Sequence, residues 1–266
     1  MRTMIAMFAI TAIPAFTDNY LWLLQDGGRA VVVDPGDAQP VLRELDARGL
    51  ELAGILITHW HPDHIGGLKT LTQNFPVPVP GPRAESARIS GLTQLLDDGD
   101  RVTVLDRFEF EVMALPGHTL GHIAYYCAPS GILFCGDTLF SAGCGRLFEG
   151  TPAQMYASLA RLAALPPETR VYCTHEYTMS NLAFAHAVEP SNRAVAARIA
   201  EVRNLREANL PSVPSTIGAE LRYNPFLRCA EPDVRAAAWR HAKKDVENPV
   251  DVFAVLRAWK DNFKAE

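Results

Sequence analysis

Three histidines and an aspartate stand close together directly after the apolar segment 54–57. The run reads Thr58-His59-Trp60-His61-Pro62-Asp63-His64. Imidazole and carboxylate groups are ligands for zinc, iron and manganese. Because side chains alternate at a strand end, His59 and His61 are expected to point the same way, and the following turn brings Asp63 and His64 to a neighbouring point. One tetrahedral ion rarely takes four ligands from so short a loop, so this spacing predicts two adjacent ions rather than a polar surface loop.

Three further ligand-type residues each follow an apolar segment that is expected to be a strand. They are His118 after 108–113, Asp137 after 132–135, and His175 after 171–173. Taken singly, such residues are more often structural than functional. Their shared place at strand ends, where functional loops collect, favours a common site.

Two adjacent divalent ions would support hydrolysis. They lower the pKa of a shared water from about 15.7 to about 7, which corresponds to about 12 kcal/mol in favour of hydroxide. No serine or cysteine nucleophile is then required, and Asp63 could accept a hydrogen bond from the hydroxide and orient it. A thiol, with a pKa of about 8.5, leaves without strong protonation. The chain offers no obvious dedicated acid, which favours an activated ester such as a thioester.

The elements that must position these residues are short apolar segments separated by turn signals. The expected strands are 21–24, 30–33, 54–57, 101–104, 108–113, 123–127, 132–135 and 171–173, preceded by a first strand within 4–16. Helix-like segments at 39–48 and 152–165 lie between them. This pattern predicts sheets covered by helices. The last third differs, with expected helices at 191–208, 232–242 and 250–263 and a loop at 209–215.

Composition excludes several classes of protein. The formal net charge of −5 over 266 residues argues against a general binder of nucleic acid or acidic membranes. There is no apolar run of about 18 residues, so no transmembrane helix is expected. The five cysteines are scattered without a CxxC pair, which favours free thiols in a reducing compartment over a disulfide framework. The reducing compartment predicts a cytoplasmic protein. We also expect a monomer.

The His-x-His-x-Asp-His run, followed by the elements around His118, Asp137 and His175, resembles the metallo-β-lactamase superfamily. Within it, the chain is most similar to the glyoxalase II (hydroxyacylglutathione hydrolase) family. The segments that carry this narrower resemblance are PAFTDNY at 14–20, VDPG at 33–36, GCGRLFEG at 143–150, THEY at 174–177 and YNPF at 223–226. The resemblance implies an α+β fold, an αββα sandwich at 1–178 followed by an α-helical, glutathione-binding domain at 179–266.

The family pattern also implies roles for single residues. His59, His61 and His118 would hold the first ion. Asp63, His64 and His175 would hold the second, and Asp137 would bridge both. The implied activity is hydrolysis of S-D-lactoylglutathione and related 2-hydroxyacyl glutathione thioesters by a hydroxide between the ions, the second step of methylglyoxal detoxification. The ions are expected to be zinc, with iron or manganese as alternatives.

Because glutathione carries carboxylates, cationic residues are expected to contact the substrate. The resemblance adds two aromatic residues to these expected contacts. Arg257 and Lys260 are neighbours on the last expected helix, where they flank its apolar stripe of Val252, Leu256, Trp259 and Phe263. The resemblance implies that both bind the glycyl carboxylate. Arg146 and Tyr177 are the other expected glutathione contacts. Phe148 stands where some members of the family have tyrosine, so it keeps only an apolar wall for the substrate.

Other residues of the same types have open or structural interpretations. His122 is expected to be a packing or hydrogen-bonding residue, and His186 and His241 to be structural. Asp34 could orient a ligand imidazole or could simply shape the turn at 34–36, and the sequence does not decide between them.

Three alternative functions remain open. A sulfur dioxygenase on the same scaffold would use one iron, fewer ligands and no helical extension. A β-lactamase commonly has cysteine where this chain has Asp137. A non-catalytic binding module would have little use for two complete ion sites.

Overall fold

The apolar segments at the start of the chain form a four-stranded sheet with the order β1-β2-β3-β4 in this computed structural model, which describes residues 8–243 and 245–264. The strands are Ala9–Ala15 (β1), Asn19–Asp26 (β2), Arg29–Val33 (β3) and Glu51–Leu56 (β4). Neighbours are antiparallel except β3 and β4, which are parallel. The expected first strand is confirmed over Ala9–Ala15, while residues 4–7 lie outside the described part of the chain.

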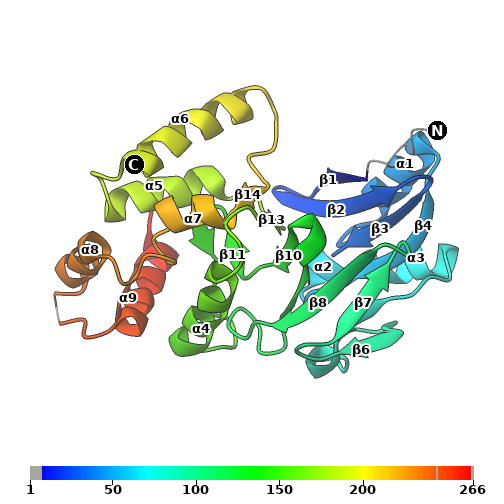
Figure 1. Cartoon of the computed structure of the whole chain (residues 1–266), viewed down its shortest axis with the longest axis horizontal. Helices are drawn as coiled ribbons and strands as arrows, with labels where there is room; N and C mark the ends of the chain where they lie inside the picture. The colour runs from blue at the N-terminus through cyan, green and yellow to red at the C-terminus, as the bar shows by residue number, and fades with distance from the viewer. Residues whose placement is uncertain (1–7, 244, 265–266) are drawn as a thin grey trace. The chain divides into compact units, whose positions relative to one another are not determined.

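Helix α1 (Ala38–Arg48) makes the crossover between the parallel strands β3 and β4. Asp37 caps its first turn by accepting a hydrogen bond from the Gln39 N–H, and Gly49 ends it in the left-handed conformation that glycine adopts without steric cost. Figure 1 shows α1 beside β1 and α3 (Leu68–Asn74). Buried side chains from both helices and from β1–β4 form one hydrophobic core.

A second group of strands follows along the chain. Strands β7 (Arg101–Val104), β8 (Phe108–Ala114) and β9 (Ile123–Cys127) pair antiparallel, as expected from three of the predicted segments. A small parallel pair, β5 (Pro80–Pro82) with β6 (Gln94–Leu96), was not predicted, because three-residue strands carry too few residues for an alternating pattern. Short helical turns lie at Pro62–Ile65 (α2), Arg83–Glu85 and Ala128–Ser130.

The chain forms two compact units. Unit 1 is Met1–Ala114 with Gly121–Ser130, and unit 2 is Leu115–Leu120 with Gly131–Glu266. The expected division after residue 178 concerns the domains of the family pattern, and it stays a prediction.

Unit 2 begins with strands whose ends carry expected ligands. Strand β10 (Ile132–Gly136) pairs in parallel with β13 (Arg170–Cys173), and β13 pairs antiparallel with β14 (Ser215–Thr216). A two-stranded hairpin, β11 (Leu139–Phe140) with β12 (Gly143–Cys144), follows Asp137. Helix α4 (Pro152–Ala163) starts at a capping box in which Thr151 and Gln154 bond each other's backbone.

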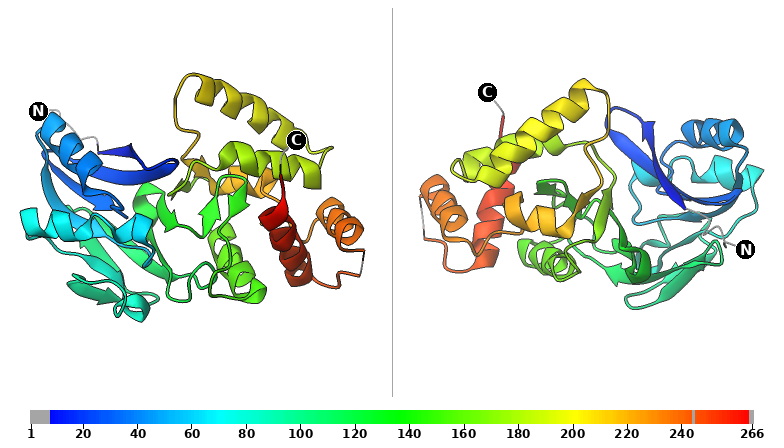
Figure 2. Two further views of the ribbon diagram at one scale, coloured as in Figure 1. Left: turned by 180° about the vertical axis from the view of Figure 1, so that it is seen from behind. Right: turned by 45° about the horizontal axis from the view of Figure 1, so that its top comes forward.

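Five helices make up most of the remaining chain. They are α5 (Thr178–Val188), α6 (Arg193–Glu207), α7 (Ile217–Tyr223), α8 (Pro232–Ala242) and α9 (Pro249–Asn262). Helices α5 and α6 run side by side, and α8 packs against α9 (Figure 2). The three helices predicted in the last third are confirmed to within two residues at their ends, whereas α5 and α7 were not predicted. None of the described helices is long and apolar enough to cross a membrane.

Candidate metal centre

The loop that follows β4 carries four of the expected ligands within unit 1. Strand β4 ends at Leu56, and Pro62 opens the short helix α2, with His61 as its N-cap. Proline suits the first helical position because its missing N–H would have no partner there. The extended segment before Pro62 therefore presents His59 and His61, and the first turn of α2 presents Asp63 and His64.

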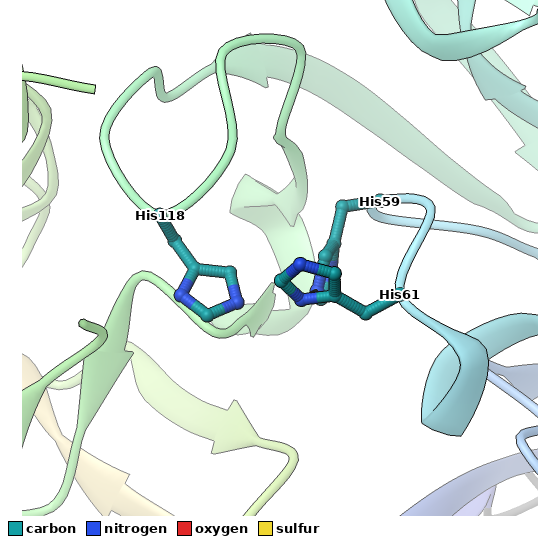
Figure 3. A group of neighbouring side chains, drawn as sticks. All are labelled: His59, His61 and His118. Atoms are coloured by element: carbon teal, nitrogen blue, oxygen red, sulfur yellow. Dashed lines mark hydrogen bonds between the residues drawn. The ribbon is translucent and has the colours of Figure 1, made fainter. Parts of the chain in front are cut away.

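His59 and His61 extend from the same loop with their rings close together, as Figure 3 shows. His59 Nε2 lies 3.1 Å from His61 Nδ1, and His64 Nε2 lies 3.6 Å from Asp63 Oδ2. Two ligand atoms at about 2.1 Å from one tetrahedral ion lie about 3.4 Å apart. Both separations therefore fit donors that share an ion.

Asp34 and Thr58 orient two of these imidazoles. Asp34 accepts hydrogen bonds from the Thr58 N–H at 2.8 Å and the Thr58 hydroxyl at 2.7 Å, and its Oδ2 lies 3.1 Å from His64 Nδ1. Because the only hydroxyl proton of Thr58 goes to Asp34, the His59 Nδ1–H must donate to Thr58 Oγ1, 3.1 Å away. This tautomer places the lone pair of His59 on Nε2. Asp34 also shapes the turn, since its backbone oxygen accepts from the Gly36 N–H.

Asp63 is held on two sides. The Asn19 side-chain amide donates to Asp63 Oδ2 at 3.0 Å, and Asn19 is itself buried. On the backbone side, Gly36 approaches so closely that a Cβ placed there would lie 1.8 Å from the Asp63 carbonyl oxygen. The 34–36 turn therefore packs directly on the loop that carries the ligands.

His122 is fully buried and stacks on His59, with 4.7 Å between the ring centroids and 27° between the planes. This contact agrees with the packing role expected for it. His186 is exposed on α5, and His241 is exposed and stacks on Trp259 at 4.2 Å.

In unit 2, two imidazoles converge on one carboxylate. His118 Nε2 lies 3.4 Å from Asp137 Oδ2, and His175 Nε2 lies 3.3 Å from the same oxygen. Each residue stands just past a strand, after β8, β10 and β13 respectively. All three are buried.

The tautomer of His118 indicates whether the cluster of His118, Asp137 and His175 is suited to bind a cation. Its Nδ1 lies 2.9 Å from the Arg146 carbonyl oxygen, which can only accept, so Nδ1 carries the proton. A neutral His118 then presents a lone pair on Nε2 to the Asp137 carboxylate, and two such groups repel. A proton or a metal ion between them removes the repulsion. The donor set therefore fits a divalent metal ion.

Aromatic rings surround the ligands of unit 2. Tyr177 stacks on His175 with an interplanar angle of 1° and a centroid distance of 4.7 Å, and Phe140 meets both rings edge-on. Phe148 meets His118 edge-on at 5.2 Å and is 64% exposed. Phe148 thus offers an accessible apolar surface beside a candidate ligand.

The expected cations cluster around one carboxylate, Asp261. Arg257 donates to Asp261 Oδ1 at 2.9 Å, and Arg146 Nε lies 3.6 Å from the same oxygen. Lys260 donates to the carbonyl oxygen and hydroxyl of Ser180. Burial, followed by the charges of Arg257 and Arg146, lowers the pKa of Lys260 to about 8. Three cations with one anion make this region attractive to carboxylates.

Arg257 is the most buried of the three cations, at 5% exposure. Its Nη1 donates to the Cys144 carbonyl oxygen at 2.8 Å, and its guanidinium lies over the Phe226 ring. Its buried Nε has no hydrogen-bond partner within residues 8–243 and 245–264. The sequence did not predict this burial, because helical spacing places Arg257 only beside the apolar stripe of α9.

The five cysteines are free and buried. Burial raises the pKa of Cys144 to about 11 and that of Cys173 to about 12. These thiols are therefore protonated at neutral pH and are poor nucleophiles or metal ligands. Sequence reasoning missed Asn19, Ser180 and Asp261, although Asp261 could have been found from its i,i+4 spacing to Arg257.

Comparisons with known proteins give two family matches along the chain. Residues 16–175 match the family model described as the metallo-beta-lactamase superfamily, and residues 176–263 match that of the hydroxyacylglutathione hydrolase C-terminus. A hydroxyacylglutathione hydrolase from Aeromonas hydrophila is 54% identical over 258 residues, covering 97% of this chain and 100% of the relative. The enzyme of that name from Ectopseudomonas mendocina is 57% identical over 260 residues, with the same coverage.

Solved structures share the fold at lower identity. ETHE1 from Myxococcus xanthus matches with a TM-score of 0.63 and 25% identity, over 96% of this chain and 98% of that one. The BLEG-1 B3 metallo-beta-lactamase matches with a TM-score of 0.60 and 27% identity, over 83% and 99%. TTHA1623 in a di-iron-bound form matches with a TM-score of 0.59 and 28% identity, over 82% and 100%.

Proposed function

The chain belongs to the metallo-β-lactamase superfamily and, within it, to the hydroxyacylglutathione hydrolases, and from this membership we propose that it hydrolyses S-D-lactoylglutathione to glutathione and D-lactate. Related 2-hydroxyacyl glutathione thioesters would be substrates of the same site. The reaction would be the second step of methylglyoxal detoxification.

The proposed cofactor is a pair of divalent ions held by both ligand sets. The first would take His59, His61 and His118, the three side chains drawn in Figure 3. The second would take Asp63, His64 and His175, with Asp137 as the bridge. When bound, such ions lower the pKa of water to about 7 and polarise a carbonyl group. Zinc is the first candidate and iron or manganese the alternatives, and the di-iron form of TTHA1623 supports a two-ion site.

The chain's own residues would orient the reacting groups. Asn19 fixes the Asp63 carboxylate, which would accept a hydrogen bond from the attacking water and thereby aim its oxygen at the thioester carbon. Asp34, Thr58 and the Arg146 carbonyl group keep the ligand imidazoles in the tautomer and orientation that they need. The thiol of glutathione can leave as thiolate, so no side chain has to protonate it strongly.

The proposed binding region for the glutathione part lies in 179–266 with the nearby loop of Arg146 and Phe148. Arg257 and Lys260 would bind the glycyl carboxylate, and the unpartnered Nε of Arg257 is a donor suited to that task. Arg146 and Tyr177 would contact the rest of the peptide, and Phe148 would form an apolar wall. The region would stay selective for carboxylates because its three cations outnumber Asp261.

The observation that carries this proposal is the match of residues 176–263 to the hydroxyacylglutathione hydrolase C-terminus. The test is turnover of S-D-lactoylglutathione by the purified full chain, followed by thiol release and paired with metal analysis. We expect turnover, about two metal ions per chain, and loss of activity on chelation that added zinc restores.

Three outcomes would contradict the proposal. A chain that hydrolyses an acyl-coenzyme A thioester with the same efficiency as the glutathione thioester would lack the proposed glutathione site. One iron per chain with consumption of oxygen would indicate a dioxygenase. Hydrolysis of a β-lactam without turnover of the thioester would indicate a β-lactamase.

The remaining proposals concern where and in what form the protein works. Five free cysteines suit the reducing cytoplasm. We expect a monomer that binds neither nucleic acid nor membranes, which light scattering on the purified chain and sedimentation with lipid vesicles would check.

A further inference from the structure

The hairpin of β11 and β12 is buried, although it is only six residues long. Its pairs are Leu139 with Cys144 and Phe140 with Gly143. The turn residues Ser141 and Ala142 are 1% and 0% exposed. Water cannot serve the polar backbone groups of such a turn, so other parts of the protein must supply their hydrogen-bond partners.

Three side chains from two helices supply these partners. Asn181 of α5 donates to the Ser141 carbonyl oxygen at 3.1 Å. Glu220 of α7 accepts from the Ala142 N–H at 2.8 Å. Asn224, at the end of α7, donates to the Phe140 and Gly143 carbonyl oxygens at 3.2 and 2.9 Å. Ala142 has a φ of 57°, a left-handed conformation that a residue with a Cβ rarely adopts, so its shape depends on these bonds.

Glu220 and Asn224 also hold each other in one orientation. The Asn224 amide donates to Glu220 Oε2 at 3.0 Å, and Asn224 Oδ1 accepts from the Phe226 N–H at 3.1 Å. The Tyr223 hydroxyl donates to Glu220 Oε1 at 2.9 Å. Glu220 and Asn224 are both fully buried. Burial raises the pKa of Glu220, although the hydrogen bonds oppose this effect.

The hairpin in turn contacts residues of the proposed substrate site. The Phe140 ring meets Tyr177 and His175 edge-on, at centroid distances of 5.5 and 5.7 Å. The Cys144 carbonyl oxygen accepts from Arg257 Nη1 at 2.8 Å. A displacement of the hairpin would therefore move the support of both Tyr177 and Arg257.

We propose that Glu220 and Asn224 are positioning residues for substrate binding: they fix the 139–144 hairpin and, through it, Arg257 and Tyr177. This inference rests on the proposed function. Neither residue would touch the substrate, so their effect would fall on KM more than on kcat.

The sharpest variant is Asn224→Asp, which keeps the shape of the side chain. It replaces the amide N–H donor, which faces two carbonyl oxygens and Glu220, with an oxygen that can only accept. We expect this variant and Glu220→Leu to raise KM and the Kd for glutathione about tenfold or more, because small displacements of a binding group are costly. Glu220→Gln should keep KM and the Kd for glutathione near those of the wild type. Its oxygen can accept from the Ala142 N–H while its amide donates to Tyr223.

Two variants control for a merely structural effect. Leu45→Ala removes buried volume in α1, and Val234→Ala removes buried volume in α8. Both should lower Tm and leave KM and the glutathione Kd unchanged. If Asn224→Asp does not fold, Asn224→Ser takes its place, since it loses the same donors without adding a charge.

Hydrogen exchange of the 139–146 segment separates this inference from the proposed function. Faster exchange in the Asn224 variant than in both controls, with raised KM and Kd, would support it. Exchange that matches the controls would overturn it, whatever the wild type hydrolyses. Faster exchange with unchanged KM and Kd would overturn the link to the substrate. A wild type that neither binds glutathione nor hydrolyses its thioesters would overturn the proposed function and, with it, this link.

Discussion

The two ligand sets are built in different ways. Unit 1 gathers His59, His61, Asp63 and His64 on one loop of six residues, and Asp34 and Asn19 brace that loop from the neighbouring strands and turn. Unit 2 gathers three ligands from loops after three different strands. A contiguous set depends mainly on local chain geometry, whereas a dispersed set depends on the pairing of distant strands. The first can be recognised in a sequence by its density, and the second only by its places at strand ends.

The largest effect should come from a residue that serves both ions. If Asp137 is the bridge, Asp137→Ala should remove both ions and lower kcat by on the order of a thousandfold, since each ion stabilises charge by several kcal/mol. His59→Ala should weaken the first ion and leave part of the second in place. Metal analysis of both variants, with His186→Ala as the exposed-histidine control, checks the difference. Equal metal loss in both variants would mean that the two ligand sets bind their ions interdependently.

Asp34→Asn should sharpen the comparison within unit 1. The amide would present N–H groups to the Thr58 hydroxyl, which already donates to Asp34, and to His64 Nδ1, which lies 3.1 Å from Asp34 Oδ2. We expect zinc affinity to fall about 10- to 100-fold. Competition with a coloured chelator measures the affinity, and exposed Asp46→Asn is the matched control. An unchanged affinity would show that the contiguous loop keeps its shape without this brace.

Arg257→Ala should separate binding from metal chemistry in unit 2. If the guanidinium binds a carboxylate, its loss should raise KM about tenfold or more, since hydrogen bonds to charged groups contribute about 1.5–3 kcal/mol. Metal content should not change. Tm should fall as well, because the bond to the Cys144 carbonyl is lost. A loss confined to kcat would argue against a binding role.

The smallest effect concerns pH. The folded-state pKa of Lys260 is lowered from 10.5 to about 8, so its charge is lost as pH rises through about 8. Between pH 8 and 10.5 the Lys260 amine is more protonated in the unfolded chain than in the folded protein. Its contribution to the free energy of unfolding therefore increases as pH rises through this range. KM for a glutathione thioester should rise a few-fold between pH 7 and about 9. Kinetics of Lys260→Gln, in which this rise should be absent, provides the check.

Much of the fold and of the contiguous ligand set could be predicted, because dense motifs and apolar strands depend on local sequence. Most predicted strands, such as Arg101–Val104, are confirmed nearly to the residue. Helix α5 was missed because its residues are apolar around most of its circumference, so no amphipathic stripe marks it.

Side-chain partners were the least predictable part. Sequence could not decide between two roles for Asp34, and the structure gives it both, since its carboxylate serves Thr58 and His64 while its backbone forms the turn. Arg257 was expected beside an apolar stripe and is instead buried against the Cys144 carbonyl. These side-chain contacts join residues from 24 to 113 positions apart in the sequence and leave no local pattern.

The close approach of Gly36 to Asp63 has a consequence for how the protein can vary. No side chain, not even a methyl group, fits between the two backbones without moving the loop that carries His61 and His64. In a library of all single substitutions, position 36 should therefore be as intolerant as a ligand position, although glycine has no atom that could bind a metal. A position can be essential to a metal centre solely through the space that it leaves empty.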